Sequence, residues 1–343
     1  MQISCDIMKY SFSPETFFVT EVSKPMLEEK GKYYYYTLEK KGVSQKQAAK
    51  KIPTQSFFAG IKDKHATTKQ IFCTKEKIDD INEENFKTKF IGESNEKIYV
   101  GIHKGNNFKV VVELSEEEQK ALKHFKPKNE AICNYFGEQR FGEKNLEVIK
   151  LIEKEDYQKA LKVFLTKETR MDSELSKKMR RIIEDNWGNW KEICETEIIK
   201  GTRKAEIFQF LTENPNSYKE AFSYSEPISV KIMIKAAQAL RFNEELNKLA
   251  ITKKPNNIFV EYGGEKYALS ASKAFTRSIV INPTEFEQNY RKAGLERKTF
   301  FYVEKFKTKR INQNKFELNF FLDKGCYATV FLKFFNNWLS KKH

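Results

Sequence analysis

The chain has 343 residues and carries 62 Lys+Arg against 47 Asp+Glu, a formal net charge of +15. Hydrophobic residues make up 40% and aromatic residues 14%, which argues against disorder and is enough for one large or two medium domains. No apolar run approaches the roughly 20 residues of a membrane-spanning helix. The first residues also lack the basic start and apolar stretch of a signal peptide. We expect a soluble, cytoplasmic protein.

The positive charge favours a polyanionic partner, because each phosphate that a protein neutralises releases condensed counterions. A lysine-rich genome would produce the same composition, so charge suggests nucleic acid without specifying a reaction. The five cysteines are odd in number and form no C-x-x-C pair, and the four histidines show no metal-ligand spacing. The sequence therefore predicts no disulfide framework, no metal and no cofactor.

The first third of the chain is predicted to contain strands and a short helix. Residues 17–22 and 33–38 are rich in aromatic and β-branched residues, which favour strands. Ser44 is a candidate N-cap for a helix that Pro53 ends. Residues 107–114 place apolar side chains on one face at a period of two, which predicts another strand.

The middle of the chain, residues 145–248, has mainly helical patterns with charged faces. Short strands are expected again after Pro255 and the Gly263-Gly264 pair. Residues 316–322 predict a strand, and residues 328–339 a final helix. This order favours an α+β fold in which a sheet domain is interrupted by an inserted helical domain.

The densest polar cluster is FFAGIKDKHATTKQ, residues 57–70. It places Asp63 between Lys62 and Lys64 just beyond a short apolar run, a position where scaffolds present functional groups. A solvated charged turn is the simpler interpretation of the same pattern. In an extended segment the two lysines project opposite to Asp63, so they need not pair with it.

Two further segments combine aromatic residues with glycine. NYFGEQRFG, residues 134–142, mixes aromatics with Arg140, which suits stacking on bases if the rings are exposed, and suits a core turn if they are buried. LDKGCYAT, residues 322–329, joins a strand to a helix and resembles an ordinary turn.

Taken together, these segments resemble the motifs of the TruD family of pseudouridine synthases. FAGIKDKHATTKQ is similar to the family's Gly, Lys-Asp and Ala-x-Thr-x-Gln signature, NYFGEQRFG to its second motif, and DKGCYATVFLKF to its C-terminal motif. PETFFVTEV, GNNFKVVV and QALRFNEELNKL are weaker matches. The order is that of the family and spans nearly the whole chain. Thr16, Tyr33 and Cys326 depart from the usual residues.

The resemblance implies a catalytic domain with a central mixed, mostly antiparallel sheet flanked by helices, over residues 1–148 and 297–343. Residues 149–296 would form the mainly helical inserted TRUD domain. The expected partner is tRNA, usually at uridine 13, with no membrane and no metal, and we expect a monomer.

By the same resemblance, the enzyme would isomerise uridine to pseudouridine after flipping the base out of its stack. Asp63 would be the catalytic carboxylate, acting as nucleophile or base. The resemblance assigns uridine binding to Phe17, Asn134, Phe136 and Tyr327. Lys62, Gln70 and Arg140 would order the pocket or contact phosphate.

A nearby cation would stabilise the ionised Asp63 carboxylate. The family usually has a lysine where Ser11 stands here, and Lys9 is the candidate replacement. The main alternative is a TruD-like protein that binds or folds RNA without modifying it. A nucleotide-dependent transferase is disfavoured because neither common phosphate-loop motif is present.

Overall fold

The computed structural model describes residues 12–137, 140–142, 144–169, 172–224, 227–252, 259–262, 265–271, 278–289 and 293–341. Its contacts divide the chain into two compact units. The sheet unit comprises Met1–Asn134, Ala250–Thr276 and Thr299–His343, and the helical unit comprises Tyr135–Leu249 and Arg277–Lys298. Within the described ranges, no helix combines the length and the apolar character needed to cross a membrane.

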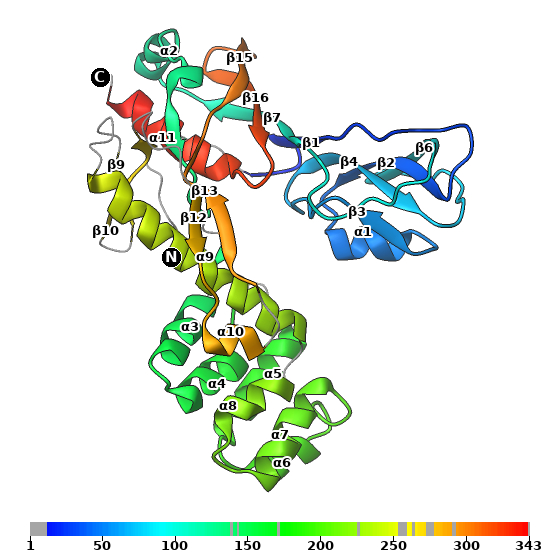
Figure 1. The fold of residues 1–343 in the computed structure, drawn as a ribbon, viewed down its shortest axis with the longest axis vertical. Helices are drawn as coiled ribbons and strands as arrows, with labels where there is room; N and C mark the ends of the chain where they lie inside the picture. The colour runs from blue at the N-terminus through cyan, green and yellow to red at the C-terminus, as the bar shows by residue number, and fades with distance from the viewer. Residues whose placement is uncertain are drawn as a thin grey trace. The chain divides into compact units, whose positions relative to one another are not determined.

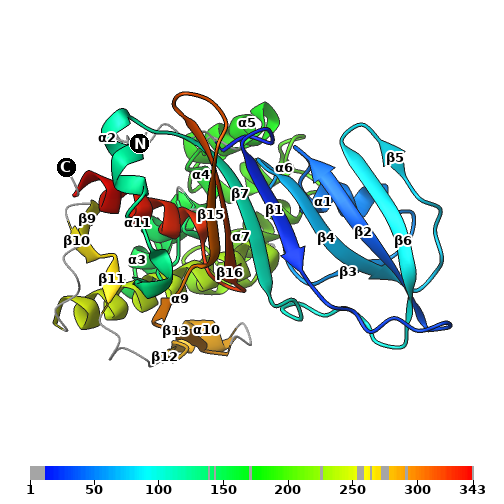
Figure 2. The same ribbon diagram turned by 90° about the horizontal axis from the view of Figure 1, so that it is seen from above.

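The sheet unit is built on one large sheet (Figure 2). Its strand order is β15 (Glu304–Arg310), β16 (Lys315–Asp323), β7 (Gly105–Glu113), β1 (Phe17–Val22), β4 (Thr67–Thr74), β2 (Tyr33–Lys41), β6 (Phe86–Ser94) and β5 (Asn82–Glu83), with β3 (Ser56–Phe58) also on β4. β1 and β4 are parallel, and the other pairs are antiparallel. The predicted mixed, mostly antiparallel sheet is confirmed.

Helix α1 (Gln45–Lys51) covers one face of the sheet where β2 and β4 pair. It begins at Ser44, whose hydroxyl accepts from the Gln47 N–H while the Gln47 side chain accepts from the Ser44 N–H, so the predicted N-cap is a full capping box. Ala48 packs with Tyr36, Leu38 and Phe72, which β2 and β4 point inward. This packing gives the half of the sheet that carries the Asp63 loop its own apolar core.

The other end of the sheet is covered by α11 (Ala328–Ser340), drawn in red in Figure 1. Phe331 of α11 lies 4.6 Å from the ring of Phe320 on β16, and Phe335 lies 4.8 Å from Phe125. Strand β7 approaches β16 closely at Gly105, where a Cβ atom would stand 2.2 Å from the Leu322 carbonyl oxygen. Glycine is therefore required at this crossing.

Smaller elements complete the sheet unit. Helix α2 (Glu116–Leu122) and the 3-10 turn η1 (Pro127–Asn129) lead into β8 (Ala131–Cys133). β8 pairs with both β11 (Ser270–Ala271) and β14 (Phe300–Phe301), and β9 (Phe259–Tyr262) forms a hairpin with β10 (Glu265–Ala268). Asn134, one of the predicted site residues, directly follows β8.

The helical unit agrees with the helical pattern expected for the middle of the chain. Its elements are α3 (Asn145–Glu153), α4 (Tyr157–Thr166), α5 (Glu174–Asp185), α6 (Trp190–Glu195), α7 (Arg203–Glu213), α8 (Tyr218–Ala221), η3 (Phe222–Tyr224), most of α9 (Pro227–Thr252), β12 (Ser278–Ile281), α10 (Glu285–Asn289) and β13 (Leu295–Lys298). The predicted limits of the inserted domain, residues 149 and 296, come from the family resemblance and not from contacts within the structure. They stay a prediction.

Candidate active site

The predicted site residues fall in both units. Asp63, Lys62, Gln70, Phe17, Asn134 and Tyr327 belong to the sheet unit, and Phe136 and Arg140 to the helical unit. Lys9, the predicted cation for Asp63, lies outside the described residues.

Asp63 lies in the loop that joins β3 to β4, with its side chain partly exposed. Its Oδ1 accepts a hydrogen bond of 2.9 Å from the His65 N–H, a turn that aspartate side chains commonly form. Ile61, two residues earlier, is 86% exposed, so the loop presents its outer side to solvent. Such a loop needs anchoring from beneath.

Lys40 provides one anchor for the Asp63 loop. Its Nζ, on β2, donates to the carbonyl oxygens of Val43 at 2.7 Å, Lys62 at 3.3 Å and Asp63 at 2.9 Å. The side chain is almost completely buried, and this burial lowers the pKa of Lys40 to about 8, against the attraction of the Asp63 carboxylate. Lys40 is therefore a buried cation whose desolvation lowers the stability of the fold, and it bonds directly to the backbone of the Asp63 loop.

Lys62 provides a second anchor, because its side chain turns inward from the same loop. Its Nζ donates to Glu21 Oε2 at 2.5 Å, and both side chains are almost fully buried. Glu21 Oε1 also accepts from the Ser23 hydroxyl at 2.9 Å. His103 lies against this pair, and burial, followed by the Lys62 charge, lowers its pKa, so its neutral form is favoured.

Hydrogen bonds bring three of the sequence motifs together around this loop. The Gly101 N–H donates to the Ala59 carbonyl at 2.7 Å, and Lys324 Nζ donates to the Gly101 carbonyl at 2.5 Å. The Thr67 hydroxyl donates to the Pro14 carbonyl at 2.7 Å. Segments distant in sequence, around residues 14, 60, 101 and 324, thus share one region of the sheet unit.

The other predicted residues of the sheet unit have varied surroundings. Phe17 is 6% exposed and its ring contacts Phe12 and Phe108. Gln70 is also buried and donates from Nε2 to Gln45 Oε1 at 3.0 Å. Tyr327 is half-buried at the N-cap of α11, and its carbonyl accepts from the Val330 and Phe331 N–H groups.

Asn134 is buried and directly follows β8. Its N–H donates to the Thr299 carbonyl at 2.9 Å, which continues the pairing of β8 with the segment that leads into β14. This backbone bond sets the place of Asn134 at the end of the small sheet.

In the helical unit, Phe136 is held by its backbone. Its N–H donates to Asn243 Oδ1 at 2.8 Å, and its carbonyl accepts from Asn243 Nδ2 at 3.1 Å, so one α9 amide satisfies both groups. The Arg297 guanidinium lies 4.0 Å from the ring centroid, and the Phe242 ring meets it edge-on. These contacts leave the ring 8% exposed.

Phe136 lines a hollow of about 490 Å³ within the helical unit, together with Arg140, Gln238 and Arg297. The Arg140 guanidinium lies 5.7 Å from the Phe136 ring, so these two predicted residues are together. Tyr135, Phe136 and Phe141 are all buried. Of the two alternatives that the sequence allowed, exposed rings or a core turn, the structure shows the buried one. Three guanidinium or aromatic groups thus surround one ring beside a cavity.

Sequence reasoning did not select Lys40, Glu21 or Asn243. A signal for Lys40 was present, since Tyr36, Leu38 and Lys40 share one face of β2 at a period of two and the first two are clearly core residues. Glu21 and Asn243 lay inside motifs that were noted for their family match only. Among the described side chains, no group of three His, Cys, Asp or Glu residues has a geometry that could hold a metal ion.

A family model described as "tRNA pseudouridine synthase D (TruD)" matches residues 8–261. The chain belongs to the TruD family. The resemblance stated from the sequence motifs is thereby confirmed, and with it the expectation of a pseudouridine synthase, an isomerase. The alternative, a TruD-like protein that only binds or folds RNA, is not favoured.

Known TruD proteins are similar along nearly the full chain. "Probable tRNA pseudouridine synthase D 1" of Methanococcus maripaludis is 26% identical, over 95% of this chain and 98% of its own. tRNA pseudouridine synthase D of Aquifex aeolicus is 27% identical, over 93% and 96%. The crystal structure of a TruD protein from Methanosarcina mazei aligns with a TM-score of 0.63 at 20% identity, covering 94% of this chain and 92% of that one. That likeness supports the fold.

Proposed function

We propose that this TruD protein converts a uridine of tRNA, the one at position 13, into pseudouridine, with Asp63 as the catalytic carboxylate. The observation that carries the proposal is the double anchoring of the Asp63 loop by Lys40 and by the Lys62–Glu21 pair. A solvated charged turn, the simpler interpretation, needs no buried cations. A catalytic carboxylate does need a fixed position, because small displacements of reacting groups cost orders of magnitude in rate.

The proposed reaction is an isomerisation that needs no external reagent. The target uridine leaves its stack at a cost of a few kcal/mol. The bond between N1 and the ribose then breaks, the base turns, and carbon 5 bonds to the ribose. The hydrogen on carbon 5 leaves as a proton and N1 gains one. Asp63 attacks the sugar or removes a proton, and in either role it acts as an ionised carboxylate.

Lys40 takes the role that the sequence gave to a cation near Asp63. Its ammonium bonds to the Asp63 carbonyl and attracts the carboxylate charge. Lys9 remains a second candidate for that role. Lys62, by contrast, acts as an anchor, since its charge is already paired with Glu21.

The remaining residues are proposed to receive the flipped base. Phe136 offers a ring whose backbone is held at both polar groups, and stacking on such a ring contributes roughly 1–3 kcal/mol per base. By the family resemblance, Asn134 provides an amide for the base edge, and Phe17 and Tyr327 also bind the uridine. Arg140 and Gln70 are supporting residues that order their surroundings or contact phosphate. The protein acts as a monomer in the cytoplasm, and residues 149–296 form the inserted TRUD domain.

Release of tritium from tRNA labelled at carbon 5 of uridine tests the proposal. Asp63→Asn is the sharper variant, because asparagine keeps the oxygen that accepts from the His65 N–H and removes only the charge. We expect release by the unaltered protein and none by Asp63→Asn, with both binding tRNA equally. Release at the same rate from both would exclude Asp63 from catalysis, and binding without release from either would favour the RNA-binding alternative.

A further inference from the structure

A second hollow, distinct from the one at Phe136, lies among helices of the helical unit. Its volume is about 580 Å³, and four basic residues line it: Lys144, Arg180, Arg203 and Lys204. No lining residue that the structure describes is acidic. The rest of the wall is largely apolar and includes Phe164 and Ile232, of which Ile232 is 51% exposed.

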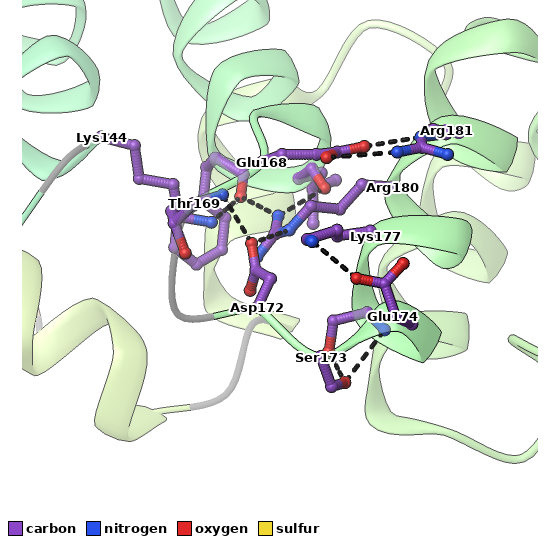
Figure 3. A network of polar contacts seen from close by, with 12 residues as sticks. Lys144, Glu168, Thr169, Asp172, Ser173, Glu174, Lys177, Arg180 and Arg181 are labelled. Carbon is purple, nitrogen blue, oxygen red and sulfur yellow. Dashed lines mark hydrogen bonds and ion pairs between the residues drawn. The ribbon is translucent and has the colours of Figure 1, made fainter.

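Two of the four cations have a structural role at the C-terminus of α4 (Figure 3). Lys144 Nζ donates to the Phe164 carbonyl at 2.8 Å, and Arg180 donates to the Leu165 carbonyl at 2.8 Å. Arg180 is also paired with Asp172, with Nε 2.9 Å from Oδ2. Cations at these carbonyls are expected, because the last carbonyls of a helix lack partners and carry partial negative charge.

Helix capping does not account for the other two cations. Arg203 and Lys204 begin α7 and line the same hollow, although the first turn of a helix favours negative rather than positive charge. The Thr202 hydroxyl donates to the Ile199 carbonyl, so no side chain caps this helix start. Both cations are therefore repelled by the positive end of the helix dipole and by their basic neighbours.

The neighbouring positive charges also affect the pKa of Lys144. Burial, followed by the nearby Arg180 charge, lowers the pKa of Lys144 to about 7, with Lys204 acting in the same direction and Asp172 in the opposite one. An anion in the hollow would relieve the repulsion and restore the charge on Lys144. Four cations gathered around one open hollow, whose described lining residues include no carboxylate, are the arrangement of an anion-binding site.

We propose that this hollow binds one nucleotide of the RNA substrate other than the uridine that is modified, with its phosphate on Arg203, Lys204 and Lys144 and its base against Phe164 and Ile232. The hollow lies within the range of roughly 300–1,000 Å³ that ligand sites occupy, more than a phosphate alone would fill. Cations for the backbone beside apolar walls for the base are the usual means of holding unpaired nucleotides. The inference rests on the proposed RNA substrate.

The test is the salt dependence of tRNA binding by the full-length protein. Arg203→Gln combined with Lys204→Gln removes two charges from the hollow. Lys154→Gln combined with Lys191→Gln removes two exposed charges from the same unit that do not line it. The slope of log affinity against log salt should fall by about 1–2 for the first pair, with roughly tenfold weaker binding near 150 mM salt. The second pair should bind like the unaltered protein.

A third variant, Ile232→Glu, guards against a folding artefact, because residue 232 is half exposed on α9 and accepts a polar side chain there. It adds a negative charge at the wall and should weaken binding by about tenfold or more. The proposed site is wrong if the Arg203→Gln/Lys204→Gln variant binds tRNA as tightly as the Lys154→Gln/Lys191→Gln variant and with an unchanged salt slope. If the unaltered protein does not bind tRNA at all, the proposed function fails too, so the two failures are distinguishable.

Discussion

Replacement of Lys40 by methionine tests whether the buried cation serves catalysis or only the fold. The pKa of this lysine falls from 10.5 to about 8, so its charge costs the folded protein about 3 kcal/mol. Because the folded pKa lies below the unfolded one, the unfolded state holds more protons between pH 8 and 10.5. Stability therefore rises with pH through that window, and at neutral pH the charge is a burden.

Lys40→Met removes this burden but leaves three carbonyl oxygens without their donor, each worth about 1–3 kcal/mol if no water replaces it. The two effects partly cancel, and we expect a destabilisation of about 1–3 kcal/mol, which a domain of ordinary stability survives. Turnover should fall much further, on the order of 100-fold, because the Asp63 loop loses its anchor.

The assay is tritium release in a single turnover with tRNA bound, measured from about pH 6 to pH 10 on proteins shown to be folded. Lys41→Met is the matched control, since Lys41 is next in sequence and exposed, and its ammonium pairs with the exposed Glu15 carboxylate. The rate of the unaltered protein should fall above about pH 8 as Lys40 loses its proton. Lys40→Arg, whose charge does not titrate in this range, should move that fall to higher pH. Lys40→Met turning over as fast as Lys41→Met would refute the reasoning.

Two further variants test the supports of the site. Glu21→Gln leaves the buried Lys62 ammonium without its countercharge and should lower the free energy of unfolding in urea by about 3–5 kcal/mol. Glu15→Gln breaks an exposed pair and should leave the free energy of unfolding nearly unchanged. Equal losses from the two variants would mean that burial gives the Lys62–Glu21 pair no extra effect on stability. Asn243→Ala removes both bonds to the Phe136 backbone and should cost about 2–4 kcal/mol of stability and raise KM for tRNA, while an unchanged KM would show that Phe136 needs no such support.

Local patterns predicted the elements around the site well. Ser44 begins a helix because its hydroxyl and the Gln47 amide satisfy two N–H groups within one turn, a property of four consecutive residues. Strand β7 follows from the alternation of Phe108, Val110 and Val112, which the sheet buries on one face. Such features depend on neighbours in the sequence, and for that reason the sequence alone reveals them.

The partners of the site residues could not be predicted in the same way. Lys40 meets the Lys62 and Asp63 carbonyls across 22 and 23 positions, and Phe136 meets Asn243 across 107. Which groups meet over such separations depends on strand register and helix packing. A buried lysine also contradicts the rule that lysines are exposed, so the period of two on β2 was outweighed by residue type.

The placement of buried charge follows from what the Asp63 loop has to do. A loop that is to meet a large RNA, as we propose for this one, cannot be covered by other elements. Residues 59–66 have no strand ladder to hold them, so backbone bonds alone would leave Asp63 mobile. Lys40 instead holds the loop by its carbonyls, while Lys62 holds it by its own side chain on Glu21. Both interactions lower the stability of the fold through the desolvation of charge, a penalty that apolar side chains at the same positions would avoid. Both buried cations lie in or next to the loop of one partly exposed carboxylate, Asp63. This placement is explained if the protein must preserve the orientation of that carboxylate.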